Sequence, residues 1–166
     1  HGNRYTAKQR STIKISANNP SKIGDKLSIT KTFNSGEKFD FTQFDYEVPV
    51  GQSGFKAFAS ASRLEFEIGK ELRTNPVSMG NADTSEVGIK YPIQRTNNQS
   101  VFLKTSIEKK EIYNETTGVI TNNKTVENTK IGLDFEGKNI FQDSSLSGVS
   151  VSGIIGDLDL SKVNSD

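Results

Sequence analysis

The sequence of 166 residues contains no cysteine, no tryptophan and a single histidine, His1. Without cysteine the chain forms no disulfide framework, thiol nucleophile or zinc site built on thiolates. One histidine is too few for a histidine relay or a histidine-rich metal site. No run of about 18 apolar residues is present, which excludes a transmembrane helix. Basic residues (21) nearly balance acidic residues (20), so the net charge of +1 offers no electrostatic argument for nucleic-acid binding.

Polar and apolar residues alternate along most of the chain with a period of two, which is typical of β-strands with one wet face. The even positions from Arg4 to Ser16 are all polar, whereas the odd positions include Tyr5, Ile13 and Ile15. Seven further segments alternate in the same way: 26–33, 43–50, 63–68, 86–94, 101–108, 130–136 and 149–152. The pattern predicts eight strands in an up-and-down meander and no helix.

The predicted strands are long, several of them about 12–17 residues against a mean near 5–6 in soluble proteins. Connections of different length alternate along the chain. The shorter ones are 19–25, 51–54 and 95–99, and the others are 34–38, 73–82 and 114–123, of which the last two are clearly longer. Short turns at one end and longer loops at the other are typical of outer-membrane barrels. The apolar positions change parity near residues 41–44 and 61–64, where a β-bulge is one physical way to change face.

This alternation fits two architectures. In a soluble β-sandwich the apolar face forms the core and the charged face meets water. In a transmembrane barrel the apolar face meets lipid and the charged face lines a wet lumen. Low hydrophobicity (32%) and polar loops favour the sandwich, and strand length with a simple meander favours the barrel. The pattern by itself leaves both open.

Five short motifs in order resemble a known family. They are Gly2-Asn3-Arg4-Tyr5-Thr6, Asn18-Asn19-Pro20 with Gly24-Asp25-Lys26-Leu27, Tyr46-Glu47-Val48-Pro49-Val50-Gly51 with Gly54, Tyr91-Pro92-Ile93-Gln94-Arg95, and Gly153-Ile154-Ile155-Gly156-Asp157-Leu158-Asp159-Leu160. Over nearly its whole length the chain resembles the barrel of the two-partner secretion transporters (TpsB, haemolysin and filamentous-haemagglutinin secretion type). The Val-Arg-Gly-Tyr tip of that family's lumenal loop is absent here, so no residue of the loop is carried over.

The resemblance implies a bacterial outer-membrane protein that secretes or activates a large partner exoprotein, a haemolysin or adhesin of TpsA type. It implies a transmembrane β-barrel of 16 strands in the full protein, preceded by two periplasmic POTRA domains and a plugging helix. Residues 1–166 are then expected to be one partial barrel domain, family strands two to nine. The expected partners are the exoprotein, outer-membrane lipid or lipopolysaccharide and the remainder of the barrel, with no nucleic acid. The alternative is a soluble β-sandwich or adhesin-type binding module.

Basic residues on one strand face form the most suggestive pattern in the chain. The resemblance implies that such a face lines the lumen and contacts a translocating chain; the alternative is a solvated strand face with no specific role. The candidate lumen-lining residues are Arg4, Lys8, Arg10, Lys14, Glu65, Glu67 and Lys90. Aromatic residues flank the apolar band of membrane barrels. The candidate interface aromatics are Tyr46, Phe66, Tyr91 and Phe135.

The chain offers no motif for catalysis: we find no nucleophile elbow, P-loop, dinucleotide fingerprint or histidine-based site. Asp157 and Asp159 share a strand face, but the full oxygen cage that calcium needs is missing. The pair Glu65 and Glu67 alternates with apolar residues, which indicates a wet strand face rather than paired catalytic carboxylates. The sequence therefore predicts no enzyme, no cofactor and no metal site.

Overall fold

The computed structural model describes residues 10–34, 39–68, 78–116, 119–138 and 146–159. Eight β-strands follow one another in these ranges, so the prediction of an all-β chain of eight strands is confirmed. They are β1 (Arg10–Asn18), β2 (Lys26–Asn34), β3 (Phe39–Val50), β4 (Phe55–Ile68), β5 (Ser78–Arg95), β6 (Gln99–Thr116), β7 (Val119–Lys138) and β8 (Leu146–Asp159). Across the described ranges we find no helix with the length and apolar character needed to cross a membrane.

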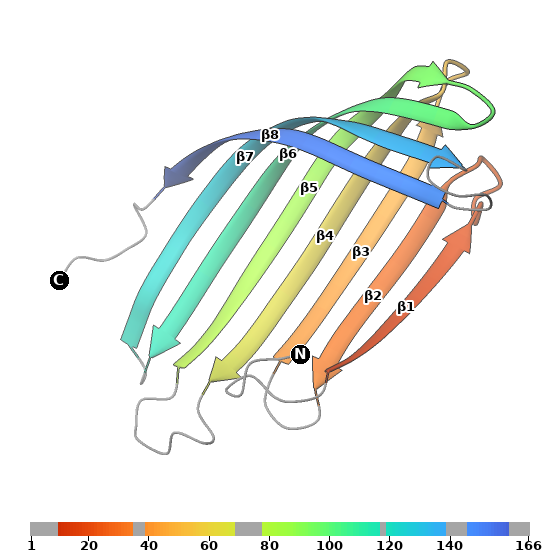
Figure 1. Cartoon of the computed structure of the whole chain (residues 1–166). Helices are drawn as coiled ribbons and strands as arrows, with labels where there is room; N and C mark the ends of the chain where they lie inside the picture. Colours follow the sequence, from red (N-terminus) through yellow and green to blue (C-terminus); the bar gives the residue numbers. More distant parts are fainter. Residues whose placement is uncertain (1–9, 35–38, 69–77, 117–118, 139–145, 160–166) are drawn as a thin grey trace.

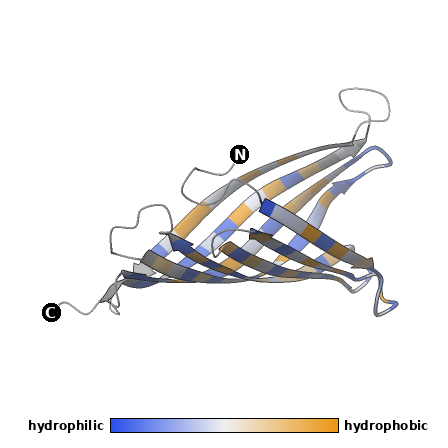
Figure 2. Cartoon of the chain, turned by 90° about the horizontal axis from the view of Figure 1, so that it is seen from below, coloured by the Kyte–Doolittle hydropathy of each residue, from blue (hydrophilic) through white to orange (hydrophobic). Residues whose placement is uncertain are grey.

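Each strand pairs antiparallel with the next one in the chain, and the sheet order is β1-β2-β3-β4-β5-β6-β7-β8. The predicted meander is therefore confirmed. The sheet curves along its width, and β8 crosses at a steep angle to the first strands in the view of Figure 1. Seen from below, the curved sheet forms an open trough (Figure 2). Within the described residues, the outer edges of β1 and β8 pair with no further strand.

The strand connections lie at the two ends of the sheet, which we name the turn end and the far end. The turn end holds the turns 19–25, 51–54 and 96–98, and at the far end β2, β4 and β6 end and β3, β5 and β7 begin. The prediction of a long far-end loop over 114–123 is wrong, because β6 continues to Thr116 and β7 begins at Val119. Polar residues such as Asn114 and Asn123 resemble a loop in the sequence, but they also suit a strand with both faces wet.

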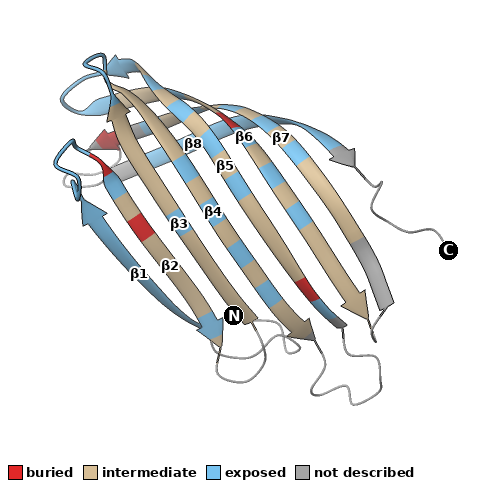
Figure 3. Ribbon diagram, turned by 180° about the vertical axis from the view of Figure 1, so that it is seen from behind, coloured by how far each residue is buried: buried red, intermediate tan, exposed pale blue. Residues whose placement is uncertain are grey.

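Successive residues point to opposite faces of the sheet, and the two faces differ in exposure. Along β4 to β7 the residues of one face are mostly exposed and those of the other are half-buried, as the alternating colours of Figure 3 show. We name the more exposed side the convex face and the other the concave face. Val87, Ile107 and Ile131 lie on the convex face, and Glu86, Glu108 and Lys130 lie on the concave face.

The two changes of parity in the apolar pattern occur without a β-bulge. The registers of β2 with β3, β3 with β4 and β4 with β5 are continuous, so the expected bulges at residues 41–44 and 61–64 are absent. Register shifts occur instead at Pro92/Gln94 and at Asn114/Glu115. Phe41 and Leu64 therefore lie on the concave face, whereas Phe44 and Ala61 lie on the convex face. The apolar residues change face because the environment of each face changes along the strand.

The described part of the chain has no dry core. None of its hydrophobic side chains is buried, and the buried residues are the polar Asp25, Ser28 and Ser106 together with Gly80 and Gly137. A soluble sandwich of this size would bury its apolar residues between two sheets. Here a single sheet exposes them, so the stability of the sheet depends on what covers its convex face.

Candidate functional site

Large apolar side chains cover the part of the convex face that is nearer to the turn end. In the cross-strand rows Val87 lies opposite Ile107, and Leu103 lies opposite both Tyr91 and Leu133. These side chains are exposed in the isolated sheet, by 59% for Val87 and 61% for Ile107. A contiguous apolar surface over several strands is unusual for a soluble monomer and marks a surface that contacts lipid or another protein. We name this surface the apolar band.

The apolar band ends abruptly in the direction of the far end. On β5 the next convex residues after Val87 are Ser85 and Asp83, and on β6 the next after Ile107 are Lys109 and Glu111. The strands continue beyond this boundary: the segment Ser78–Glu86 of β5 spans about 30 Å at roughly 3.3 Å per residue. The convex face is therefore apolar in one half and charged in the other.

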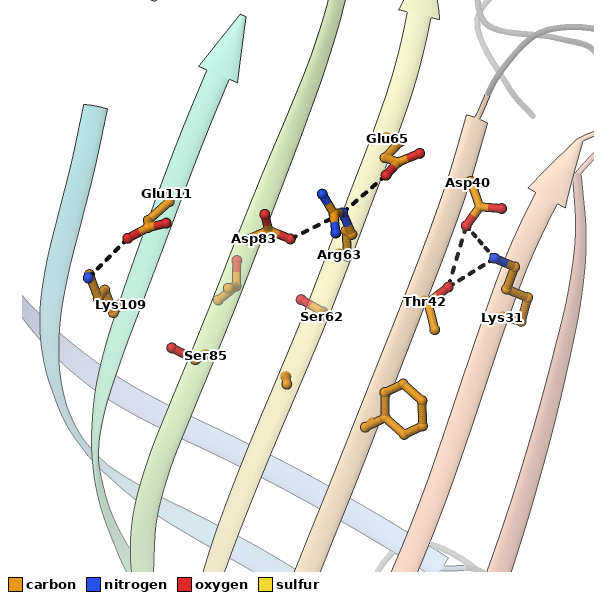
Figure 4. Close-up of a pocket in the computed structure, with 13 residues that line it drawn as sticks. Lys31, Asp40, Thr42, Ser62, Arg63, Glu65, Asp83, Ser85, Lys109 and Glu111 are labelled. Carbon is orange, nitrogen blue, oxygen red and sulfur yellow. Dashed lines mark hydrogen bonds and ion pairs between the residues drawn. The ribbon is translucent and has the colours of Figure 1, made fainter. Parts of the chain in front are cut away.

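Ion pairs cover the charged half of the convex face (Figure 4). Lys31 Nζ on β2 lies 2.5 Å from Asp40 Oδ1 on β3, and Lys109 Nζ lies 3.0 Å from Glu111 Oε1 on β6. Arg63 Nε on β4 lies 3.0 Å from Glu65 Oε1 and 3.5 Å from Asp83 Oδ1. These groups surround an open groove of about 700 Å³. Their exposure of roughly half suits contact with water or polar headgroups and not with hydrocarbon.

The concave face carries a ladder of charged groups at the level of the apolar band. Glu47 on β3 contacts lysines from two other strands: its Oε1 lies 2.7 Å from Lys56 Nζ on β4, and its Oε2 lies 3.1 Å from Lys90 Nζ on β5. Asp45 accepts hydrogen bonds from the hydroxyls of Ser28 (3.1 Å) and Ser60 (2.8 Å). Each of the four carboxylate oxygens of Glu47 and Asp45 thus contacts a side chain on the concave face.

The ladder continues across β5 to β7. Glu86 lies 3.4 Å from Lys104 Nζ and 3.7 Å from Lys130 Nζ, and it accepts a hydrogen bond of 2.6 Å from the Ser106 hydroxyl. Glu108 lies 2.5 Å from Lys130 Nζ and accepts a bond from the Asn128 amide at 2.9 Å. These charges are half-buried, and their ion pairs and hydrogen bonds offset the cost of removing them from water. The concave face therefore suits a wet cavity in which charged side chains satisfy one another.

Gly88 makes room for an aromatic ring in this ladder. A Cβ atom at residue 88 would lie 2.6 Å from Phe58 Cζ and would also meet the Thr105 carbonyl oxygen. The Phe58 ring in turn lies beneath two ammonium groups, with Lys104 Nζ at 4.5 Å and Lys90 Nζ at 5.8 Å from its centroid. The lack of a side chain at Gly88 thus sets the position of a cation–π contact on the concave face.

The turn between β1 and β2 is held by a buried carboxylate. The Asp25 side chain accepts hydrogen bonds from the Ser21 backbone N–H and from the Tyr46 hydroxyl, both at 3.1 Å. Gly24 adopts a φ of +86°, in the left-handed region that favours glycine. Burial of Asp25 opposes its ionisation, but the hydrogen bonds from Ser21 and Tyr46 outweigh this and lower the pKa of Asp25. These bonds therefore fix the turn and join it to β3 through Tyr46.

The structure divides the candidate lumen-lining residues between the two faces. Arg10, Lys14 and Lys90 lie on the concave face, and Arg10 stacks its guanidinium 4.1 Å from the centroid of the Phe39 ring. Glu65 and Glu67 lie on the convex face, where Glu65 pairs with Arg63. The remaining two, Arg4 and Lys8, lie outside the described residues.

The candidate interface aromatics are likewise divided. Tyr46, Tyr91 and Phe135 lie on the convex face in the half nearer to the turn end, and the Tyr91 ring packs against Phe55 with centroids 4.6 Å apart. Phe66 lies on the concave face near the far end, in the row that contains Phe39 and Gly80. The first three thus share one face and one end of the sheet, and Phe66 does not.

Sequence reasoning missed the carboxylates that hold the concave ladder. Glu47, Glu86 and Glu108 belong to three different strands, and only the strand register shows that they lie near lysines of neighbouring strands. The sequence does show that each of these glutamates alternates with apolar residues, which places it on the polar face of its strand. Among the described residues, no cluster of three or more potential ligands could hold a metal ion.

Comparisons with known proteins agree with this geometry. The chain resembles the structure of CdiB from Escherichia coli with a TM-score of 0.75 and 15% identity, over 94% of this chain and 30% of that one. It resembles CdiB from Acinetobacter baumannii with a TM-score of 0.71 and 16% identity, over 95% of this chain and 30% of that one. The chain thus spans about a third of the length of these structures. The comparison with curated protein sequences gives no match.

Residues 1–151 match the family described as haemolysin secretion/activation protein ShlB/FhaC/HecB. This range contains the convex apolar band of β5 to β7, the concave ladder and the Asp25 turn. The eight-stranded antiparallel meander is the fold of part of a two-partner secretion transporter barrel. Because the match extends over most of the sequence, the chain belongs to the ShlB/FhaC/HecB family of secretion transporters.

Proposed function

We propose that this chain forms part of the wall of an outer-membrane β-barrel, with its convex face toward lipid and its concave face toward a water-filled lumen. The observation that carries the proposal is the distribution of side chains: exposed apolar residues such as Val87 and Ile107 on one face, and hydrogen-bonded ion pairs such as Glu108–Lys130 on the other. Membrane barrels have this arrangement, whereas soluble sandwiches place apolar residues between two sheets.

Within the part of the chain that the structure describes, the outer edges of β1 and β8 are unpaired, which supports a larger barrel. Unpaired backbone groups in the hydrocarbon region each cost several kcal/mol, so a membrane sheet must close through further strands. The chain covers 30% of the two matched structures, which agrees with a segment of a wall. We propose that residues 1–166 provide strands two to nine of a 16-stranded barrel, and that the remaining strands pair with β1 and β8.

The lumen-facing role is proposed for Arg10, Lys14 and Lys90, together with the ladder carboxylates. Glu65 is proposed to face outward at the far end, above the hydrocarbon, because it shares a half-exposed ion pair with Arg63. Tyr46, Tyr91 and Phe135 are proposed to contact the interfacial region at the turn end. Outer-membrane lipid or lipopolysaccharide would then contact the convex face.

The function supported by family membership and geometry is translocation of a large partner exoprotein across the bacterial outer membrane. The wall contributes no catalytic group to this function: its polar lumenal surface allows an extended chain to pass. Folding of the exported chain outside the cell, where apolar burial and hydrogen bonding are gained, supplies direction without a chemical energy source. We propose that the protein is a transporter and not an enzyme.

Cell fractionation together with a secretion assay tests the proposal. We expect the full-length protein in the outer-membrane fraction, soluble only with detergent, and we expect deletion of its gene to remove the partner exoprotein from the culture medium. Expression of the gene from a plasmid should restore secretion. Recovery of the full-length protein in a soluble fraction without detergent would contradict the proposal and favour a sandwich-type binding module.

A further inference from the structure

Among the residues that the structure describes on the concave face, lysines outnumber carboxylates. The strand register places Lys56, Lys90 and Lys104 directly opposite one another on β4, β5 and β6. Like charges in directly opposite positions of a sheet repel each other. Counter-charges or a ligand of opposite charge offset this repulsion. The counter-charges among the described residues offset it only in part.

The counter-charges near this row are shared. Glu47 serves both Lys56 (2.7 Å) and Lys90 (3.1 Å), and Glu86 is the carboxylate nearest to Lys104 (3.4 Å) but also contacts another lysine. Each of these two glutamates therefore carries one negative charge for two ammonium groups, and Lys130, the second lysine beside Glu86, also contacts Glu108. Among the described residues of the concave face, lysines still outnumber carboxylates when all these ion pairs are counted.

Two further lysines add to this excess. Lys14 and Lys26 line the same concave cavity of about 370 Å³ as Lys90 and Lys104, and neither forms an ion pair with any described residue. The acidic residues that line the cavity are Asp45, Glu47 and Glu86. We name the five lysines the concave basic cluster: Lys14, Lys26, Lys56, Lys90 and Lys104.

We propose that the concave basic cluster is a binding surface for carboxylates of an extended polypeptide segment inside the lumen. This inference rests on the proposed function, because it requires that the concave face be the lumen. Lysine ammonium groups are flexible point charges, so they attract carboxylates without demanding one fixed geometry. A wall with low-dielectric surroundings also concentrates ions of the opposite sign. An acidic segment would thus be held in many registers and could still move along the wall.

The labelling rate of a single introduced cysteine reports the electrostatic potential at the cluster. This chain contains no cysteine of its own that would compete for the reagent. We place Phe58→Cys beneath Lys90 and Lys104 in the full-length protein, cleared of any cysteine elsewhere, and Ser85→Cys on the convex face as the control. Each thiol is reacted with an anionic and a cationic methanethiosulfonate of similar size. The ratio of the two rates cancels differences in thiol reactivity. We expect the anionic reagent to be favoured at least about threefold more at residue 58 than at residue 85, and less so at high salt.

Charge-reversal variants provide the matched test. Lys90→Glu with Lys104→Glu should abolish the anionic preference at residue 58, and Lys109→Glu on the convex face should leave it unchanged. Poly-glutamate should slow labelling at residue 58 in the parent protein and not in the double variant, whereas poly-lysine should not slow it. Heat-modifiable migration in gels checks that each variant is folded, and Ser60→Cys on the same face replaces Phe58→Cys if that variant misfolds.

The outcomes separate this inference from the proposed function. Equal rate ratios at residues 58 and 85, or stronger protection by poly-lysine, would overturn the binding surface while leaving the barrel wall intact. If the thiol at residue 58 is closed to aqueous reagents in the membrane-embedded protein while a thiol at Val87→Cys is open to them, the concave face is not the lumen. In that case the proposed function fails together with the inference.

Discussion

Substitution of Ile89 by arginine tests whether the apolar band faces lipid. Ile89 lies on the convex face in the middle of the band on β5, opposite Ala57 and Thr105, and is 45% exposed in the isolated sheet. The control is Ser85→Arg, on the same strand and the same face but at the edge of the band. Four residues separate the two positions, about 13 Å along the strand, or ~10 Å along the membrane normal for a strand tilt of roughly 40°.

The expected cost of each arginine depends on how deep its position lies in the bilayer. Arginine near the bilayer midplane of a membrane barrel costs about 2–4 kcal/mol, and arginine near an interface costs about 0–1 kcal/mol. An apolar band is about 25 Å tall, so a displacement of ~10 Å from its middle brings Ser85 close to the edge. We therefore expect Ile89→Arg to be less stable than Ser85→Arg by about 2–3 kcal/mol. In water, a substitution at a half-exposed position would change stability by only about 0.5 kcal/mol.

Folding into phospholipid vesicles measures the difference. Urea titrations of the full-length variants, followed by heat-modifiable migration in gels, give the free energy of unfolding for each. The slope of the titration should be the same for both variants, because the same surface is exposed on unfolding. Equal free energies for Ile89→Arg and Ser85→Arg would refute the assignment of the convex face to lipid.

Three further predictions concern packing, the turn and the far end. Gly88→Val should destabilise the protein by about 1–3 kcal/mol because its side chain would overlap the Phe58 ring, and Phe58→Ala in the same chain should recover part of the loss in a urea titration. Because hydrogen bonds lower the pKa of Asp25, its ionised form contributes stability above the ordinary pKa of aspartate, and this contribution is lost as the pH falls through the folded-state pKa. The stability gap between the parent protein and Asp25→Asn should therefore shrink in titrations at acid pH, and a gap that widens there would be inconsistent with this cause. Arg63→Ala should cost less than about 1 kcal/mol in vesicles, because its ion pairs with Glu65 and Asp83 are exposed; a much larger loss would place this end of β4 inside the hydrocarbon.

Individual strands show which features of the fold the sequence predicts and which it does not. The alternation of Leu103 and Ile107 with Lys104 and Glu108 predicts β6 correctly, because a strand with two different environments has a period of two. The sequence predicts the connection between β6 and β7 less well, because Asn114 and Asn123 have the composition of a loop but belong to paired strands. Composition cannot separate a loop from a strand that has water on both faces. The candidate Glu65 shares a face with Val87 and not with Lys90, which the sequence alone does not reveal.

Local periodicity and short connections between neighbours are enough to predict the strand count, the meander order and the alternation of polar with apolar residues along each strand. The convex side of the sheet, the end of the apolar band and the sharing of Glu47 and Glu86 between lysines are seen only in the folded sheet. Curvature and cross-strand register are properties of the whole sheet, so no local segment of the sequence encodes them. Lys56, Lys90 and Lys104 are far apart in the chain, and they meet because the antiparallel registers of β4 with β5 and of β5 with β6 bring them into one row.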